Sequence, residues 1–325
     1  MTNLTTKYLG LDLKNPIVVG ASELTNSVKS IQELAAAGAG AIVLKSLFEE
    51  QILMDINSER MNNMNDTYDH VENHLGFYLK SHSVQQYLTL IKEAKAAVDI
   101  PIIASINCYD ENEWIDFAAQ VQEAGADAIE VNLFVMPADT AVKGEQLEVD
   151  YKNIAIKLLE VVDIPVAFKL SSYFSGLANY MVELSSLGIN GLVLFNKFYS
   201  PKVDIENEAI VAAGNKTTSH DNANTLRWMG ILSGRVECDL SASTGIHTSE
   251  DVISNLLVGA NTTQMVSSIM ANGAGQITKV LKELEVWMNK KGYASIDDFR
   301  GKLNQKNIKN PMMMERAQFM KYFSE

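Results

Sequence analysis

The stretch EAGADAIEVN at residues 123–132 links the end of a predicted helix to a buried strand that finishes on a polar side chain. Gly125 can end the helix, because glycine adopts left-handed backbone angles without a steric penalty. The apolar run that begins at Ala128 is typical of a parallel strand covered on both faces. Asn132 ends the run, so this stretch predicts a unit of helix, turn, buried strand and polar strand end.

Similar turns recur as AAGAGAIVL at residues 36–44, SLGINGLVL at 186–194 and LVGANTTQM at 257–265. In all, eight apolar runs are predicted as strands: Pro16–Gly20, Ala41–Lys45, Pro101–Asn107, Ala128–Asn132, Pro165–Leu170, Gly191–Asn196, Cys238–Ser241 and Thr262–Val266. Helical patterns follow them at Val28–Ala37, Val84–Ala97, Glu111–Ala124, Tyr151–Val161, Leu177–Leu187, Ala223–Gly234, Ser249–Leu257 and Gln276–Asn289. Eight such units predict a closed α/β barrel, the (β/α)8 TIM barrel. An open doubly wound sheet is the alternative, but the first strand lacks its Gly-x-Gly-x-x-Gly turn.

We expect one domain over residues 1–325, with the barrel at about 8–290 and a C-terminal helical tail at 291–325. The 47% share of hydrophobic residues suffices for one large core, and such barrels take roughly 250 residues or more. Three connections after strands are long: 46–81, 133–148 and 197–222. Long loops at one end of a barrel are typical of binding loops, with tolerated surface insertions as the alternative. The tail, rich in methionine, either packs on the outside of the barrel or forms an interaction surface.

Charge and cysteine content narrow the range of partners. A net charge of −13 argues against a nucleic-acid partner, because nothing concentrates positive charge against phosphates. The two cysteines, Cys108 and Cys238, form no metal-ligand motif, and free thiols fit a reducing cytosol. No apolar run reaches the roughly 18 residues of a membrane span, and the amino terminus lacks a signal-peptide core. We therefore expect a cytoplasmic protein with a small-molecule partner, no metal and no membrane segment.

Polar residues at the predicted strand ends indicate where a ligand binds. They include two lysines and three asparagines: Lys45, Lys169, Asn107, Asn132 and Asn196. A buried lysine needs an anionic partner, which is either a ligand or a barrel carboxylate such as Glu130. The amides suit a planar heterocycle, because asparagine presents a donor beside an acceptor. Taken together, these side chains favour a ligand at the barrel mouth.

The ends of the last two strands read SASTGIHTSEDV at residues 241–252 and TTQMVSS at 262–268. Backbone N–H groups, hydroxyls and helix starts at such loops bind phosphate, and this is a common phosphate site on the fold. Thr248 or Ser249 could also act simply as a helix cap.

Several of these motifs together resemble the class 1 dihydroorotate dehydrogenases. The resemblance runs in order over residues 8–290 and rests on LGLDLKNPIVVGAS (9–22), LKS (44–46), EVNLFVMP (130–137), FKLSSYF (168–174), GLVLFN (191–196), STGIHTSEDVISNLLVGA (243–260) and QMVSS (264–268). It implies an FMN-dependent enzyme of pyrimidine biosynthesis that oxidises dihydroorotate, or a related planar anionic substrate, by hydride transfer to FMN. Barrel enzymes of this sort are often homodimers, so a homodimer is one expected assembly.

The resemblance also implies roles for individual positions. Lys169 is expected near the flavin, where its cation stabilises negative charge on the reduced ring, and Asn132 and Asn196 are expected to take part in catalysis beside it. The expected cofactor-binding residues are Ala21, Ser22, Lys45, Ser46, Asn107, Asn132, Lys169, Ser243, Thr244, Gly245, Val266 and Ser267. The expected substrate-binding residues are Lys45, Asn73, Gly76, Asn132 and Asn196.

The chain departs from the family pattern at three places. The cysteine that acts as a base in the family is replaced by Val135, which cannot accept a proton; general base catalysis is typically worth about 10²–10⁴-fold. A phosphate-loop glycine is replaced by Val266, and serines follow Lys169 in place of proline. Tyr173, Tyr78 and His74 are the candidates for a substitute base. Two alternatives therefore stay open: an FMN-binding homologue without dihydroorotate oxidation, and a Schiff-base aldolase with Lys169 as nucleophile. The electron acceptor, fumarate or NAD through a separate iron–sulfur subunit, also stays open.

Overall fold

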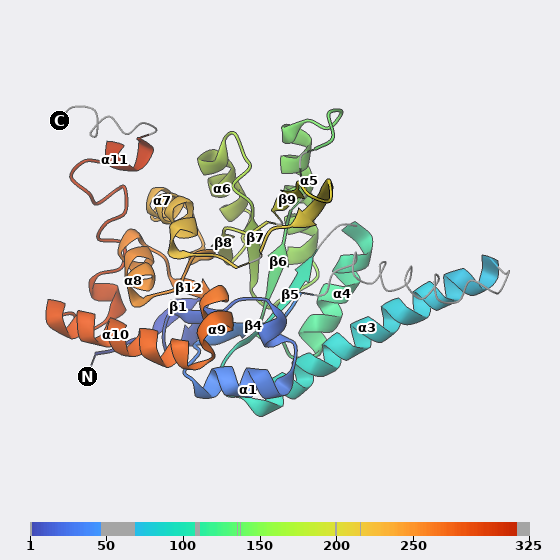
Figure 1. The fold of residues 1–325 in the computed structure, drawn as a ribbon, viewed down its shortest axis with the longest axis horizontal. Coiled ribbons are helices and arrows are strands. Elements are labelled where there is room, and N and C mark those ends of the chain that lie inside the picture. The colour runs from blue at the N-terminus through green and yellow to red at the C-terminus, as the bar shows by residue number, and fades with distance from the viewer. Residues whose placement is uncertain are drawn as a thin grey trace.

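In the computed structural model the described residues are 2–46, 69–107, 111–134, 136, 138–198, 200–214 and 216–316, without the side chains of 69–82 and 111–114. Eight parallel strands close into a barrel in the order β11-β12-β3-β4-β5-β6-β7-β8 (Figure 1). They are β3 (Ile17–Val19), β4 (Ala41–Val43), β5 (Ile102–Asn107), β6 (Ala128–Asn132), β7 (Val166–Leu170), β8 (Gly191–Leu194), β11 (Asp239–Ala242) and β12 (Thr262–Met265). The predicted (β/α)8 barrel is confirmed.

Helices cover the outside of the barrel (Figure 1). They are α1 (Val28–Ala36), α3 (Asp69–Ala97), α4 (Glu111–Glu123), α5 (Gly144–Leu159), α6 (Leu177–Ser185), α7 (Asn222–Leu232), α8 (Ser249–Val258), α9 (Ser267–Asn272) and α10 (Gly275–Lys291). No helix in the described residues is long and apolar enough to cross a lipid bilayer.

The amino-terminal hairpin closes one end of the barrel. Its strands β1 (Thr6–Tyr8) and β2 (Leu11–Leu13) pair antiparallel, and the buried side chains of Tyr8 and Leu13 join the apolar cluster inside the barrel. The backbone N–H of Leu9 donates to Asp239 at the start of β11, 2.8 Å away. A Cβ at Gly191, the first residue of β8, would lie 2.5 Å from the Leu9 side chain. The hairpin therefore plugs the amino-terminal ends of the strands and leaves the carboxyl ends for a site.

Two of the predicted loops are shorter than expected. The predicted loop 46–81 is wrong in its second part, because α3 already begins at Asp69, and the loop 133–148 is wrong at its end, because α5 begins at Gly144. The first turn of α5, which contains Gln146, is exposed, so it lacks the apolar periodicity by which helices are predicted. Similarly, β11 starts at Asp239 and ends at Ala242, one residue later than predicted.

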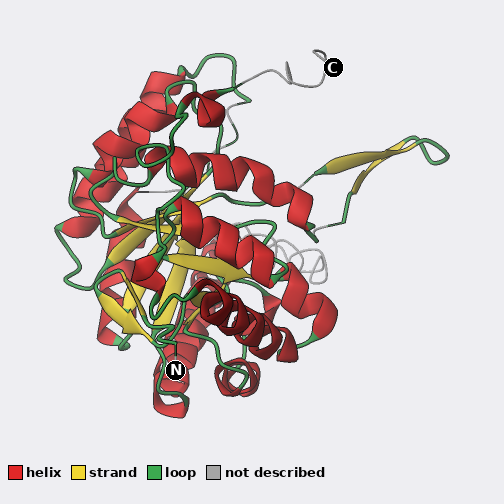
Figure 2. Ribbon diagram, turned by 90° about the vertical axis from the view of Figure 1, so that its left-hand side faces the viewer, coloured by secondary structure: helices red, strands yellow, loops and turns green. Residues whose placement is uncertain are grey.

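The predicted loop 197–222 contains secondary structure of its own. The strands β9 (Pro201–Asp204) and β10 (Ala209–Ala212) pair antiparallel, and Figure 2 shows this hairpin projecting away from the barrel. A short 3-10 helix, η2 (Ser219–Asp221), then leads into α7.

The C-terminal tail packs on the outside of the barrel in the described residues. It contains the 3-10 helix η3 (Ile296–Asp298) and the short helix α11 (Met312–Glu315). The N–H of Gln305 donates to the carbonyl of Gly230 in α7 at 2.8 Å, and a Cβ at Gly230 would lie 2.9 Å from Met314. Residues 317–325 lie outside the described part, so one domain over 1–325 stays a prediction.

Candidate functional site

A cavity of about 540 Å³ opens at the carboxyl ends of the barrel strands, opposite the hairpin plug. We call it the main cavity. Its wall consists of strand-end and loop residues: Ala21, Ser46, Ser105, Asn107, Glu130, Asn132, Phe134, Met136, Lys169, Asn196, Lys197, Phe198, Thr217, Ser243, Thr244, Gly245, Ile246, Gln264, Val266 and Ser267. Most of the predicted site residues are therefore brought together from eight separate strand ends.

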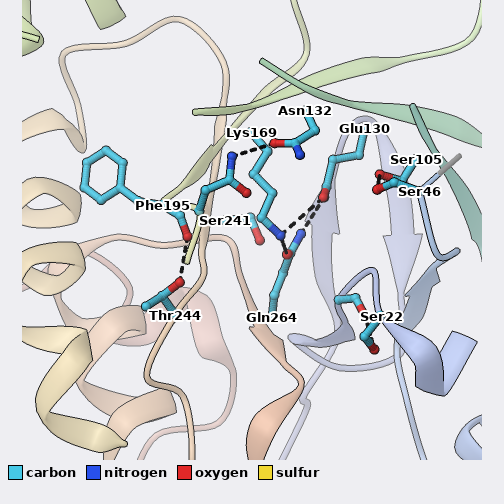
Figure 3. A network of polar contacts seen from close by, with 12 residues as sticks. Ser22, Ser46, Ser105, Glu130, Asn132, Lys169, Phe195, Ser241, Thr244 and Gln264 are labelled. Carbon is cyan, nitrogen blue, oxygen red and sulfur yellow. Dashed lines mark hydrogen bonds and ion pairs between the residues drawn. The ribbon is translucent and has the colours of Figure 1, made fainter. Parts of the chain in front are cut away.

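Lys169, Glu130 and Gln264 form one polar network in the wall of the cavity (Figure 3). The Lys169 ammonium donates to Gln264 Oε1 at 2.9 Å and lies 3.5 Å from Glu130 Oε1. The Gln264 amide donates in turn to Glu130 Oε2 at 2.5 Å. The side chains of Glu130 and Lys169 are only 1% and 13% exposed. A buried carboxylate requires a counter-ion and hydrogen bonds, so Lys169 and Gln264 explain how Glu130 is held inside the barrel.

The sequence left two anionic partners open for Lys169, a ligand or a barrel carboxylate, and the observed geometry accommodates both. Glu130 is the barrel carboxylate, and the ammonium still lines the main cavity. Glu130 Oε1 accepts no hydrogen bond among the described residues. The Lys169 ammonium therefore contacts Glu130 and also faces any ligand bound in the main cavity.

Amide and hydroxyl pairs line the cavity on either side of this network. Asn196 donates to Asn132 Oδ1 at 2.5 Å, which joins the ends of β6 and β8. The hydroxyl oxygens of Ser46 and Ser105 are 2.6 Å apart. Sequence reasoning missed Ser105, although it stands two residues before Asn107 and hence on the same face of β5. That spacing was the available signal.

Tyr87 of α3 anchors β5 just behind the cavity. Its hydroxyl donates to the carbonyl of Ser105 at 2.9 Å and accepts from the N–H of Ser105 at 2.7 Å. Burial raises the pKa of Tyr87 far above its ordinary value. The phenol therefore stays neutral and serves as a structural donor and acceptor.

Lys45 and Ser22 are not in the wall of the main cavity, although both were predicted to bind cofactor. The Lys45 ammonium lies 2.6 Å from Glu23 Oε1. Ser22 donates to the carbonyl of Gly20 and caps the 3-10 helix η1 (Glu23–Thr25), where its hydroxyl accepts from Leu24. Their roles at the cofactor remain predictions.

The turn after β11 has the properties of an anion site. Thr244 and Gly245 both have left-handed backbone angles, with φ of 78° and 79°. Helix α7 holds the turn, because Thr225 donates to the carbonyl of Ser243 at 2.9 Å and Asn222 donates to that of Thr244 at 3.0 Å. Within the described residues, the N–H groups of Thr244 and Gly245 have no acceptor. Such free donors favour an anion.

A strap from the loop before α7 crosses the same region. The N–H of Thr217 donates to Ser267 Oγ at 3.0 Å, and the Thr217 hydroxyl lies 2.9 Å from His247 Nε2. Ser268 donates to the carbonyl of Ile246 at 3.1 Å and joins the turns after β11 and β12. Thr217 and Ile246 were missed by sequence reasoning, because their place in the wall depends on how the long loop folds back.

Some predicted positions fall outside the description. Asn73, His74, Gly76 and Tyr78 lie on helix α3, and not in the expected substrate loop, in the part of α3 whose side chains are not described; the family-base position Val135 lies outside the described residues. Tyr173 is described, and its side chain is 56% exposed at the rim of the site. In the part of the chain that is described, no group of three His, Cys, Asp or Glu residues could hold a metal ion.

Comparison with known proteins gives the family. The sequence model of the family "Dihydroorotate dehydrogenase" matches residues 3–288. The chain belongs to the dihydroorotate dehydrogenase family. Members of this family are FMN-dependent oxidoreductases that act on CH–CH bonds, in pyrimidine biosynthesis.

Curated relatives of this dihydroorotate dehydrogenase family member cover nearly its whole length. The catalytic subunit of dihydroorotate dehydrogenase B (NAD(+)) from Methanothermobacter thermautotrophicus is 23% identical over 92% of this chain and 97% of its own. The corresponding subunit from Thermoplasma acidophilum is 24% identical over 93% and 99%. The dihydroorotate dehydrogenase (fumarate) of Saccharomyces cerevisiae is 27% identical over 93% and 98%.

Proposed function

We propose that this chain binds FMN in the main cavity and catalyses hydride transfer to it from a planar cyclic substrate of the dihydroorotate type. The observation that carries the proposal is the placement of the partly buried Lys169 ammonium in the same cavity as the phosphate-type turn at Thr244 and Gly245. A cation and free N–H donors in one cavity suit the ring and the phosphate of a flavin mononucleotide.

The donor set fits this cofactor. The free N–H groups of the turn after β11 suit a phosphate, and Ser267 adds a hydroxyl in the same wall. In the same wall, the Lys169 cation would favour the reduced, anionic form of the ring. Bound FMN would supply the hydride acceptor for oxidation of the substrate CH–CH bond to a double bond.

The remaining groups of the site orient the substrate. Asn132 Oδ1 accepts from Asn196 at 2.5 Å, which leaves the Asn132 amide N–H₂ and the Asn196 carbonyl for a ligand. A cyclic amide presents a carbonyl beside an N–H and would be gripped by that pair. The Gln264 bridge keeps Lys169 in place while the substrate enters.

The oxidation also releases a proton, and the described wall offers no ordinary base for it. Among the described residues of the wall there is no His, Cys or Tyr, and the carboxylate there, Glu130, is bound to Gln264 and Lys169. With Val135 in place of the family base, the proton leaves to water or to a serine, and we expect slow oxidation of dihydroorotate.

The NAD(+) and fumarate enzymes among the relatives suggest two electron acceptors. If this protein resembles the fumarate enzymes, fumarate added alone should reoxidise the reduced protein. If reoxidation by NAD requires a further iron–sulfur protein, this protein instead resembles the NAD(+) enzymes. We also propose a homodimer and a cytoplasmic location. Sedimentation velocity tests whether the protein is a dimer.

The Schiff-base alternative has less support. Lys169 Nζ donates to Gln264 and faces Glu130, whereas a Schiff-base nucleophile attacks through a free lone pair. Borohydride with a carbonyl substrate should therefore leave Lys169 unmodified. The other alternative, FMN binding without dihydroorotate oxidation, is favoured by Val135. The anaerobic mixing experiment described next distinguishes it from the proposed function.

Anaerobic mixing tests the proposal. The purified protein is loaded with FMN, and the visible absorbance of the oxidised flavin is followed after dihydroorotate is added. We expect slow bleaching that Lys169→Met abolishes. A protein that takes up no FMN would overturn the proposal, and stable FMN without bleaching would favour the binding homologue.

A further inference from the structure

Three aromatic rings from successive barrel loops meet at the rim of the main cavity. Phe134 follows β6, Tyr173 follows β7 and Phe198 follows β8. The ring centroids of Phe134 and Phe198 are 4.0 Å apart, and those of Tyr173 and Phe198 are 5.3 Å apart with nearly parallel planes. We call these three residues the aromatic rim. Because each ring stands on a different loop, their contact arises only in the folded barrel.

The aromatic rim separates the main cavity from a neighbouring one. Phe134 and Phe198 line the main cavity, while Tyr173 and Phe198 line a second cavity of about 410 Å³. Met136 lines both cavities and is 51% exposed, and Tyr173 is 56% exposed. Apolar groups gathered at the edge of a cavity are more typical of a ligand contact than of solvent-facing surface.

The charges nearby are already paired. Lys169 is paired with Glu130, and Lys197, which lines both cavities, lies 2.9 Å from Asp221. Among the described residues that line the two cavities, these two lysines are the cations. The phosphate of FMN would add further negative charge. A substrate carboxylate would therefore meet little uncompensated positive charge at this rim.

We propose that the aromatic rim selects a neutral cyclic amide that carries an apolar or aromatic substituent, in preference to a carboxylate-bearing ring such as dihydroorotate. The proposal rests on the proposed FMN-dependent function and names the substrate class of the same site. The amide edge of the ring binds at Asn132 and Asn196, and the substituent packs on Phe198. Stacking and burial of such a group supply the binding energy that a carboxylate would draw from a cation.

The redox chemistry is the same as for the parent reaction. Two C–H bonds of the ring break and a C=C bond forms; one hydrogen leaves as hydride to FMN and the other as a proton to solvent. The neutral substituent takes no part in the electron balance. It changes only which ring is held beside the flavin.

A matched pair of ligands tests the proposal on FMN-loaded protein. Orotate and 6-phenyluracil share one ring and differ in a carboxylate or a phenyl group at the same carbon. Both are titrated by the shift they cause in the spectrum of the oxidised flavin, which requires no turnover. We expect 6-phenyluracil to bind about ten-fold more tightly than orotate, from aromatic contact and burial.

Variants then assign the preference to the rim. Phe198→Ala is expected to weaken 6-phenyluracil about ten-fold and orotate less than about two-fold, whereas Phe198→Tyr keeps the ring and the preference. Tyr293→Ala serves as control, because Tyr293 belongs to a separate aromatic cluster with Trp287 and Phe299.

Three outcomes would overturn the substrate class alone. They are tighter binding of orotate than of 6-phenyluracil, equal weakening of both ligands by Phe198→Ala, and no spectral change with either ligand. Failure to bind FMN would instead overturn the function on which it rests. The 5,6-dihydro forms of the two ligands repeat the comparison for turnover, and faster bleaching by the phenyl form is the supporting result.

Discussion

Lys169 Nζ donates to Gln264 Oε1 at 2.9 Å, across 95 residues of sequence, and this contact fixes the position of the cation in the site. The same Gln264 amide donates to Glu130 Oε2 at 2.5 Å, so its side chain cannot turn without breaking both bonds. The amide therefore works as a rigid spacer between a buried carboxylate and the lysine.

Lys169→Met combined with Glu130→Gln should restore the unfolding free energy that Lys169→Met alone lowers, while the rate of flavin reduction stays low. The single variant leaves Glu130 buried without its counter-ion, which typically costs about 3–5 kcal/mol of unfolding free energy. The double variant removes both charges and should regain most of that stability in urea unfolding of the apoprotein. Its rate of flavin reduction should still be about 100-fold or more below that of the parent. Recovery of the rate in the double variant would mean that Lys169 has only a structural role.

Gly245→Ala should disrupt the anion turn and weaken FMN binding by about ten-fold or more. The residue has a φ of +79°, and a Cβ there would lie 2.4 Å from the backbone nitrogen of Asn222. Gly214→Ala is the matched control, because a Cβ at Gly214 has no atom within 4 Å among the described neighbours. Fluorescence of free FMN reports the affinity of both variants. Equal affinities would show that the turn does not hold the phosphate.

Cys238 should resist alkylation at neutral and mildly alkaline pH. Burial, with a smaller contribution from the charge of Asp239, raises the pKa of this thiol to about 12. A raised pKa keeps the thiol protonated, and alkylation requires the thiolate. In a Cys108→Ser background at pH 8, iodoacetamide should react on the order of 1000-fold more slowly than with a free cysteine of pKa about 8.5. The rate should keep rising above pH 9, where a free thiol levels off, and unfolding in urea should abolish the difference.

Val135→Cys should raise the rate at which dihydroorotate bleaches bound FMN by about 100-fold or more, because it supplies the base that the family uses. Val135→Ala is the control for the change in side-chain size. Stopped-flow absorbance under anaerobic conditions measures both. If cysteine and alanine give the same rate, lack of a base at residue 135 is not what limits the reaction.

The repeating units of the sequence predicted the barrel closely, because a buried parallel strand and a glycine-terminated helix are local patterns. The strand Ala128–Asn132 has the bounds that were predicted from EAGADAIEVN. Less local features were missed: α3 and α5 begin earlier, and a hairpin occupies the loop before α7. The first turn of α5 and the strands of that hairpin are mostly exposed, so they carry no core-facing periodicity from which they could be predicted.

The sequence by itself determined the (β/α)8 barrel, the family and the polar strand ends, since each depends on the order of residues along the chain. Only the tertiary structure decided how those ends are used. It placed Gln264 between Lys169 and Glu130, paired Lys45 with Glu23 away from the main cavity, and brought three aromatic rings together at the rim. These contacts join strands and loops far apart in the chain, and their geometry is set by closure of the barrel rather than by any local pattern.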